Sequence, residues 1–292
     1  MSAILDVAAL KAHPLPPLLE DGDKEDRGAV LVAGGGTDLA GASILAGVAA
    51  LRVGAGKLQL RSDKDGLAAL AVAVPEARII VAGTGERGTE RLSVAAGQAS
   101  SLVIGPGADT RPRERRRARR LLQAAPSASA VIDAGALPDL STAKAFAAVA
   151  GGRTVLTPHA GEMAAMLGQT KDVVSQDPLI AARQAATLFQ SVVVMKGSTT
   201  FVVMPDGATW RHGGGVCGLG TSGSGDVLAG AIGGLLARGA APIVAALWGV
   251  VMHAEAGADL TRRHGRLGFL ARELPDVLPR VMARLEASAV DA

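Results

Sequence analysis

A glycine-rich segment that leads into a single carboxylate is the part of the sequence with the clearest chemical potential. Residues 220–230 read Gly-Thr-Ser-Gly-Ser-Gly-Asp-Val-Leu-Ala-Gly, and an apolar helical pattern begins at Asp226. Unpaired N–H groups at the start of a helix, together with the helix dipole, favour an anion such as phosphate. A carboxylate placed there can take a proton from a hydroxyl that attacks the phosphate. Asp226 could also simply cap the helix, but three glycines exceed what a cap needs.

Short apolar runs that end in turn residues predict the elements that position this segment. The runs are 29–33 before Gly34-Gly35-Gly36, 102–104 before Gly105-Pro106-Gly107, 130–132 before Asp133, 154–156 before Thr157-Pro158-His159, and 192–195 before Lys196-Gly197. Because they alternate with helical patterns, we expect a mostly parallel, doubly wound sheet. Ligands bind beyond the carboxyl ends of such strands. These polar segments and the Asp226 loop are therefore expected to line one crevice.

The other predicted elements complete one domain over residues 1–292. Helices are expected at 40–53, 160–167, 226–238, 242–262 and 270–286, and a strand at 57–61. Residues 201–204 and 208–211 flank Pro205-Asp206-Gly207, which is a hairpin signal. Residues 1–27 are rich in proline and then in charge, and they are interpreted as an arm that leads into the domain.

Composition limits the classes of function. Of the 292 residues, 49% are hydrophobic, which is enough for a large core, and the net charge is +3. Seven arginines lie between residues 111 and 120, but no aromatic residue is interleaved for base stacking, so we expect a solvated helix face and no nucleic-acid binding. The single cysteine, Cys217, excludes a disulfide within the chain. No secretory signal or membrane span is predicted, and we expect a cytoplasmic protein.

Several motifs have both a functional and a structural interpretation. Gly218-x-Gly220-x-x-Gly223 matches the dinucleotide fingerprint only formally, because no strand leads into it. His159 could contact a substrate or order its loop. Lys196 could neutralise phosphate or begin a surface turn. His253 and Glu255 lack metal-ligand spacing, so no protein-held transition metal is expected, whereas Mg²⁺ accompanying a nucleotide needs few protein ligands.

Taken together, these segments resemble the ADP/ATP-dependent NAD(P)H-hydrate dehydratases, a family with the ribokinase-like fold, over roughly residues 15–285. The resemblance is carried by Gly41-Ala42, Gly105-Pro106-Gly107, Leu156-Thr157-Pro158-His159-Ala160-Gly161-Glu162, Val194-Met195-Lys196-Gly197, Pro205-Asp206-Gly207 and Gly223-Ser224-Gly225-Asp226-Val227-Leu228-Ala229-Gly230. The last segment alone is typical of the whole ribokinase-like superfamily. The Thr-Pro-His-x-Gly-Glu segment and the ordered set indicate the dehydratase branch.

The resemblance implies a three-layer α/β/α fold and the repair of hydrated NADH or NADPH, with ADP or ATP as phosphoryl donor and Mg²⁺. Asp226 would be the base toward the C6 hydroxyl of the hydrate, and phosphorylation would turn that hydroxyl into a leaving group. An anion hole would consist of Gly223, Ser224 and Gly225. The substrate would contact Ala42, Gly107, His159 and Asp226. The nucleotide would contact Lys196, Gly197, Ser198, Thr199, Thr200 and Gly225.

The resemblance further implies a homotetramer and, because the N-terminal arm is too short for the epimerase domain fused in some relatives, a separate epimerase acting on the same metabolite. Two positions depart from the family pattern. The segment Asp38-Leu39-Ala40-Gly41-Ala42 lacks the usual aromatic residue, and Gly135 stands where a second carboxylate is usual. A small-molecule kinase of the same superfamily, acting on a hydroxymethyl pyrimidine or thiazole, and a non-catalytic nucleotide-binding relative are the alternatives. The sequence does not decide between ADP and ATP, or between NADH hydrate and NADPH hydrate.

Overall fold

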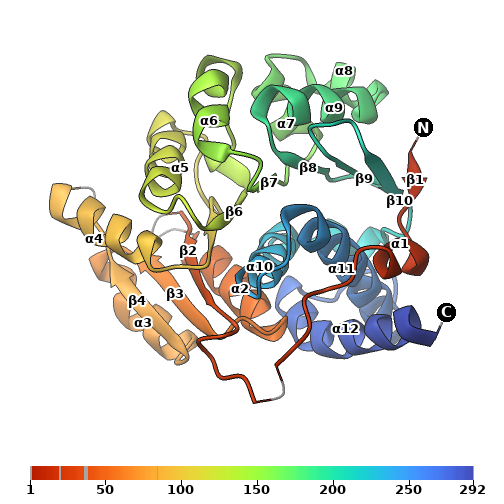
Figure 1. The fold of residues 1–292 in the computed structure, drawn as a ribbon, viewed down its shortest axis with the longest axis horizontal. Coiled ribbons are helices and arrows are strands. Elements are labelled where there is room, and N and C mark those ends of the chain that lie inside the picture. Colours follow the sequence, from red (N-terminus) through yellow and green to blue (C-terminus); the bar gives the residue numbers. More distant parts are fainter. Residues whose placement is uncertain (1, 20, 36–38, 84, 292) are drawn as a thin grey trace.

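The computed structural model describes residues 2–19, 21–35, 39–83 and 85–291. Within these residues one sheet of ten strands forms the centre of the molecule, in the order β1-β10-β9-β8-β7-β6-β5-β2-β3-β4 (Figure 1). The strands are β1 (Ala3–Ile4), β2 (Ala29–Ala33), β3 (Lys57–Ser62), β4 (Ala77–Val81), β5 (Ser101–Ile104), β6 (Ser129–Ile132), β7 (Thr154–Leu156), β8 (Val192–Met195), β9 (Thr200–Val203) and β10 (Thr209–His212). Strands β2 to β8 pair in parallel, whereas β9 runs antiparallel to β8 and β10.

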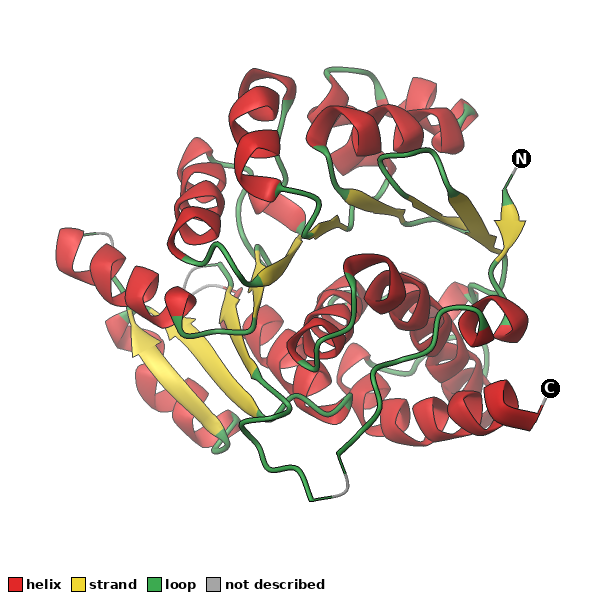
Figure 2. Cartoon of the chain, viewed as in Figure 1, coloured by secondary structure: helices red, strands yellow, loops and turns green. Residues whose placement is uncertain are grey.

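Helices cover both faces of this sheet (Figures 1 and 2). One face packs against α1 (Val7–Lys11), α2 (Ala40–Arg52), α3 (Leu67–Ala73), α10 (Ser224–Ala237), α11 (Pro242–His264) and α12 (Leu274–Asp291). The other packs against α4 (Glu86–Gly97), α5 (Pro112–Ala124), α6 (Ala143–Ala150), α7 (Ala160–Leu167), α8 (Lys171–Gln176) and α9 (Pro178–Phe189). The expected three-layer α/β/α architecture is therefore confirmed.

Strand β2 shows why the central strands are continuous apolar runs. Val30 and Val32 point into the core on the α2 and α10 side. Leu31 and Ala33 point into the core on the α4 and α5 side. Because successive side chains alternate between faces and both faces are covered, every position of such a strand is buried. In β2 the polar and glycine residues come only after the strand, at its carboxyl end, where they can meet those of neighbouring strands.

The N-terminal residues are more structured than the sequence indicated. β1 pairs in parallel with β10, and α1 contacts α12 and α11, so the expected arm begins as an edge strand and a short helix. Leu5 and Leu10 are buried in the core. The indole N–H of Trp248 on α11 donates to the carbonyl of His13 at 2.8 Å. These partners lie more than 200 residues away, and no local pattern reports them.

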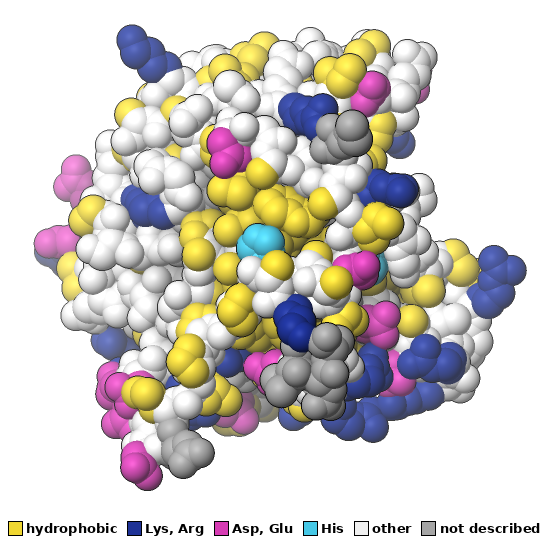
Figure 3. Space-filling view, turned by 45° about the vertical axis from the view of Figure 1, so that its right-hand side comes forward, with side chains coloured by type: hydrophobic (Ala, Val, Ile, Leu, Met, Phe, Trp, Pro, Cys, Tyr) yellow, Lys and Arg dark blue, Asp and Glu magenta, His cyan; other side chains and the backbone are white. Residues whose placement is uncertain are grey.

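Helix α11 is long and apolar enough to span a membrane by length and hydropathy alone. However, 67% of its apolar 18-residue window is buried inside the protein, as in a core helix. On the face shown in Figure 3, hydrophobic side chains gather near the centre, and charged side chains lie mainly toward the margins.

Candidate active site

The polar segments that follow the parallel strands meet at the carboxyl edge of the sheet, as predicted. Lys196 N donates to the carbonyl of Pro158 at 2.8 Å, and Lys196 forms a parallel bridge with His159. Gly35 N donates to the carbonyl of Pro106 at 2.8 Å. The segments after β2, β5, β7 and β8 are therefore joined in pairs. Residues 36–38, which belong to the predicted crevice, lie outside the described residues.

Lys196 is the centre of a charged cluster in this crevice. Its Nζ lies 3.0 Å from Asp133 Oδ1 and 3.7 Å from Glu162 Oε2, and Thr157 Oγ1 donates to Asp133 Oδ1 at 2.7 Å. Burial by itself would lower the pKa of Lys196, but Asp133 and Glu162 outweigh it and the pKa is raised. Lys196 is therefore a fixed cation within the crevice and does not begin an exposed turn.

Asp226 lies in the first turn of α10, close to this cluster. Burial and the charge of Asp133 raise its pKa to about 6, against the opposing effects of Lys196 and a backbone hydrogen bond from Gly107. A carboxyl with this pKa is ionised at pH 7 and binds a proton more readily than an exposed aspartate. Both properties suit a general base.

The loop of residues 220–225 before Asp226, here called the glycine-rich loop, is open to an anion. Gly223 has φ +89°, a left-handed conformation, and a Cβ there would lie 2.5 Å from Leu45 Cδ1. Ser224 N makes a long bond of 3.3 Å to the Thr221 carbonyl. Among the described residues, no acceptor pairs with the N–H groups of Gly223, Gly225 or Asp226. The N-terminus of α10 therefore keeps backbone donors available for phosphate.

His253 on α11 supports this loop, a role that sequence reasoning missed. Its Nε2 lies 2.9 Å from Ser224 Oγ and 3.0 Å from the Ser224 carbonyl. Burial lowers the pKa of His253 to about 4, so the ring is neutral at pH 7. Because the carbonyl can only accept, Nε2 carries the proton and donates to Ser224. The partners are 29 residues apart in the sequence, and the packing of α10 on α11 brings them together.

His159 orders its own loop. As the N-cap of α7, its Nδ1 accepts the N–H groups of Gly161 and Glu162 at 3.0 and 3.2 Å. Glu162 Oε2 in turn accepts the N–H of His159 at 2.8 Å, which completes a reciprocal cap. The ring is more than half exposed, and the role of His159 in substrate contact stays a prediction.

The remaining predicted site residues fall into two groups that meet near Lys196 and Asp226. Gly107, with φ +66°, approaches Ala42 so closely that a Cβ would lie 2.8 Å from the Ala42 Cβ. On the other side, a Cβ on Gly225 would lie 3.3 Å from Lys196 Nζ. Gly197 and Ser198 are exposed, and Thr199 and Thr200 are half-buried. Their contacts with ligands stay predictions.

The glycine at position 135 has a steric explanation. A Cβ at this position would lie 2.0 Å from the carbonyl oxygen of Asp109, in the segment that follows β5. Glycine therefore allows that segment to close against the turn after β6. The preceding residue, Ala134, has φ +48°, which is unusual for a residue with a side chain. The departure from the family pattern is thus built into the packing of the crevice.

No group of three or more His, Cys, Asp or Glu side chains within the described residues has the arrangement of a metal site. Asp133 and Glu162, whose charges act on Asp226, are both paired with Lys196. A divalent cation in this crevice would therefore depend mainly on ligands that arrive with a phosphate group.

Comparison with known proteins identifies the family. The family model for NAD(P)H-hydrate dehydratase matches residues 30–280. An ADP-dependent (S)-NAD(P)H-hydrate dehydratase of Xanthomonas campestris is 47% identical over 285 residues, covering 95% of each chain. A bifunctional NAD(P)H-hydrate repair enzyme of Moorella thermoacetica is 36% identical over 96% of this chain, which spans about half (54%) of that relative.

Solved structures agree with this assignment. The crystal structure of the ADP/ATP-dependent NAD(P)H-hydrate dehydratase of Bacillus subtilis, co-crystallised with ATP and Mg²⁺, superposes with a TM-score of 0.83 at 28% identity, covering 98% of this chain and 99% of that one. The fold is ribokinase-like, as expected. The chain therefore belongs to the NAD(P)H-hydrate dehydratase family.

Proposed function

We propose that this protein dehydrates hydrated NADH or NADPH in a nucleotide-dependent reaction that restores the reduced nicotinamide ring. The observation that carries this proposal is the position of Asp226. It lies at the N-terminus of α10, beside available backbone donors and the fixed cation Lys196, with a pKa of about 6. A base, a phosphate cradle and a cation thus occupy one crevice in a chain of this family.

In this scheme Asp226 removes the proton from the C6 hydroxyl as the hydroxyl oxygen attacks the terminal phosphorus of the nucleotide. The backbone N–H groups of Gly223, Gly225 and Asp226 hold the transferring phosphoryl oxygens, and Lys196 offsets their charge. The C–O bond of the phosphorylated intermediate then breaks as the ring nitrogen supplies its electron pair. Inorganic phosphate leaves, and loss of the C5 proton restores the double bond. Phosphorylation is necessary because hydroxide is a poor leaving group.

We assign the adenine nucleotide to the side of Lys196, Gly197, Ser198, Thr199, Thr200 and Gly225. Gly197 and Ser198 are exposed at the end of β8, and Lys196 Nζ lies close to Gly225, so a phosphate chain can pass from this turn to the glycine-rich loop. We assign the ring of the hydrate to Ala42, Gly107, His159 and Asp226. Mg²⁺ would accompany the nucleotide and neutralise its phosphates. ADP is the donor used by the Xanthomonas relative by its name, and we expect ADP here.

An assay tests the reaction directly. Purified protein is incubated with hydrated NADH or hydrated NADPH, Mg²⁺, and ADP or ATP, while absorbance of the reduced nicotinamide and release of free phosphate are followed. We expect both signals to rise together, one phosphate for each ring restored. A stable phosphoester without recovery of absorbance would instead indicate a kinase of the same superfamily. Nucleotide binding with neither signal would indicate a non-catalytic relative.

Assembly, partner and location are also proposals. We propose a homotetramer in the cytoplasm, because the family resemblance implies that assembly and because an exposed face with a hydrophobic centre favours burial against another copy (Figure 3). Light scattering of the purified protein tests the mass. A relative that is named as bifunctional supports a functional link to an epimerase acting on the same metabolite.

A further inference from the structure

A cavity lined by arginines lies outside the cluster around Lys196. It has a volume of about 260 Å³ and lies between α4 and α5. Arg113, Arg116, Arg117 and Arg120 line one wall, and Thr89 and Ser93 on α4 line the other. We call it the arginine cavity. Its four arginines belong to the run of seven at residues 111–120, which the proposed reaction does not use.

The arginines of this cavity share one face of α5. Positions 113, 116, 117 and 120 are three, four and seven residues apart, and like charges at this spacing repel one another. Glu114 is buried and pairs with Arg113, at 3.0 Å, and with Arg117. Among the described residues, no carboxylate pairs with Arg116 or Arg120. The cavity therefore holds more positive than negative charge, and a bound anion would relieve the repulsion.

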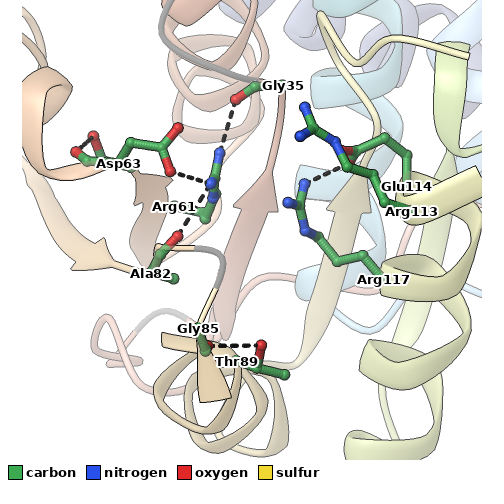
Figure 4. Close-up of polar contacts among 10 residues, drawn as sticks. Gly35, Arg61, Asp63, Ala82, Gly85, Thr89, Arg113, Glu114 and Arg117 are labelled. Carbon is green, nitrogen blue, oxygen red and sulfur yellow. Dashed lines mark hydrogen bonds and ion pairs between the residues drawn. The ribbon is translucent and has the colours of Figure 1, made fainter. Parts of the chain in front are cut away.

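Arg61, near the end of β3, lies opposite Arg117 and adds a further positive charge beside the cavity (Figure 4). Its side chain is 4% exposed, donates to the carbonyls of Gly35 at 3.0 Å and Ala82 at 3.1 Å, and pairs with Asp63. Its Nε is buried without a partner among the described residues. Burial and then the charge of Arg117 lower the pKa of Arg61, so the two guanidinium groups are close enough to repel.

A short series of contacts joins the arginine cavity to the base. Arg61 holds Gly35, and Gly35 packs so closely on the turn after β5 that a Cβ would lie 1.9 Å from the Gly107 carbonyl. The backbone of Gly107 in turn bonds to Asp226. The cavity and the base therefore lie along the same carboxyl edge of the sheet. In the sheet order, Lys196 follows β8, whereas Arg61 belongs to β3, so the two lie on opposite sides of the turn after β5 that contacts Asp226.

We propose that the arginine cavity binds the phosphate groups at the far end of the dinucleotide substrate while the hydrated ring lies at Asp226. This inference rests on the proposed function. A dinucleotide carries two phosphates between its riboses, and NADPH carries a third on the adenosine ribose. Arginine is well suited to such groups because its planar fork donates two parallel hydrogen bonds to phosphate oxygens. Binding of this remote end would help to position the ring for reaction.

Binding of NADPH itself tests the site without turnover. NADPH has the same tail as the hydrate and is titrated calorimetrically into the wild type, Arg116→Gln and Arg120→Gln at low salt. The matched control is Arg119→Gln, which makes the same change on the same helix outside the cavity. We expect each cavity variant to weaken NADPH about five- to tenfold, and the control to bind as the wild type does. Reduced nicotinamide mononucleotide keeps one bridging phosphate but lacks the adenosine half, so its affinity should differ less among the four proteins than that of NADPH.

Two outcomes would overturn the inference. One is equal NADPH affinity in the cavity variants and in Arg119→Gln. The other is binding of pyrophosphate that depends on Arg116 and Arg120 but is not displaced by NADPH, which would indicate a separate phosphorylated effector. Failure of the proposed function is distinguishable, because arginine-dependent NADPH binding in a wild type that restores no hydrate would reject the reaction and leave the site standing. In an active enzyme, the cavity variants should raise KM for hydrated NADPH about five- to tenfold and leave KM for ADP unchanged.

Discussion

The Lys196 side of the molecule and the side of the arginine cavity hold charge in opposite ways. Around Lys196, a single cation faces the carboxylates of Asp133, Glu162 and Asp226. Around the arginine cavity, five arginines share two carboxylates, and these residues are Arg61, Arg113, Arg116, Arg117, Arg120, Asp63 and Glu114. Burial, and then the neighbouring carboxylates, raise the pKa of Asp226 and so create a base. Crowded cations cannot shed their protons near pH 7, so they can only attract anions. The first side is therefore suited to proton transfer and the second to binding.

The largest expected effect comes from removing the base, and it separates proton transfer from binding. Asp226→Asn should lower kcat by about 10²–10⁴-fold, whereas cavity variants should mainly change KM. Because the ionised form of Asp226 is costly in the folded state, the folded protein binds the Asp226 proton more tightly than the unfolded chain does. The stabilisation from this bound proton is present below pH 4 and is lost as the pH rises through about 6. The variant should therefore be about 1–3 kcal/mol more stable than the wild type at pH 8. Asp276→Asn, which removes an exposed ion pair with Arg52, is the control for urea unfolding and kinetics. Full activity in Asp226→Asn would refute the assignment.

Removing the cation tests the same side by its electrostatics. Lys196→Met leaves Asp133 buried without its ion pair and should cost about 3–5 kcal/mol of unfolding free energy. It should also raise the pKa of Asp226, because Lys196 now lowers it. The measurements are urea unfolding and, for the folded fraction, the pH dependence of kcat/KM, with the exposed Lys171→Met as control. If kcat/KM falls at the same low pH in Lys196→Met as in the wild type, Lys196 does not act on Asp226.

A smaller effect than those of the two substitutions is the gradual change of kcat/KM with pH in the wild type. The base must be ionised, so kcat/KM should fall about tenfold for each pH unit below the pKa of Asp226, which lies at about 6. Arg120→Gln should lower kcat/KM without moving this acid limb. A flat profile between pH 5 and 8, or a limb that shifts in Arg120→Gln, would break the division between a side for chemistry and a side for binding.

The smallest expected effect concerns the turn between the two sides. Gly135→Ala places a methyl group 2.0 Å from the Asp109 carbonyl, so the segment after β5 must move. We expect a loss of about 1–3 kcal/mol in unfolding free energy and a modest fall in kcat/KM. Gly213→Ala, at a glycine with no positive φ and no neighbouring atom within 4 Å, is the control for adding a methyl group without a clash. Equal losses in both variants would show that contact with Asp109 is unimportant.

The sequence predicted the central strands and the helices that follow them because their signals are local. Strands β2, β8 and, after Ser101, β5 are uninterrupted apolar runs followed by glycine or lysine. Helices α2, α7, α10 and α11 begin within two residues of their predicted starts. Strand β4 was not predicted, because it is a partly exposed edge strand that contains Arg78. β1 was missed because two residues carry no pattern of their own.

The candidate site was predictable in its parts but not in its charge balance. Asp226, Lys196 and the glycine-rich loop were recognisable from residue type and spacing, and the direction of parallel strands predicted that they would meet. That Lys196 pairs with Asp133, or that His253 donates to Ser224, depends on tertiary packing across 63 and 29 residues. The arginine run was expected to be a solvated face. Only the cavity beside α4 reveals another use for it.

The pairing of β1 with β10, and the hydrogen bond from Trp248 to His13, have a consequence for biosynthesis. A ribosome makes the first thirteen residues long before it makes β10 or α11, so these early residues must wait, without their final neighbours, for most of translation. Until they dock, β10 has an unpaired edge, and the part of α11 around Trp248 is exposed to solvent. Fusion partners or deletions at the amino terminus would interfere with this late closure, and we expect lower soluble yield from them than from equivalent changes after residue 285.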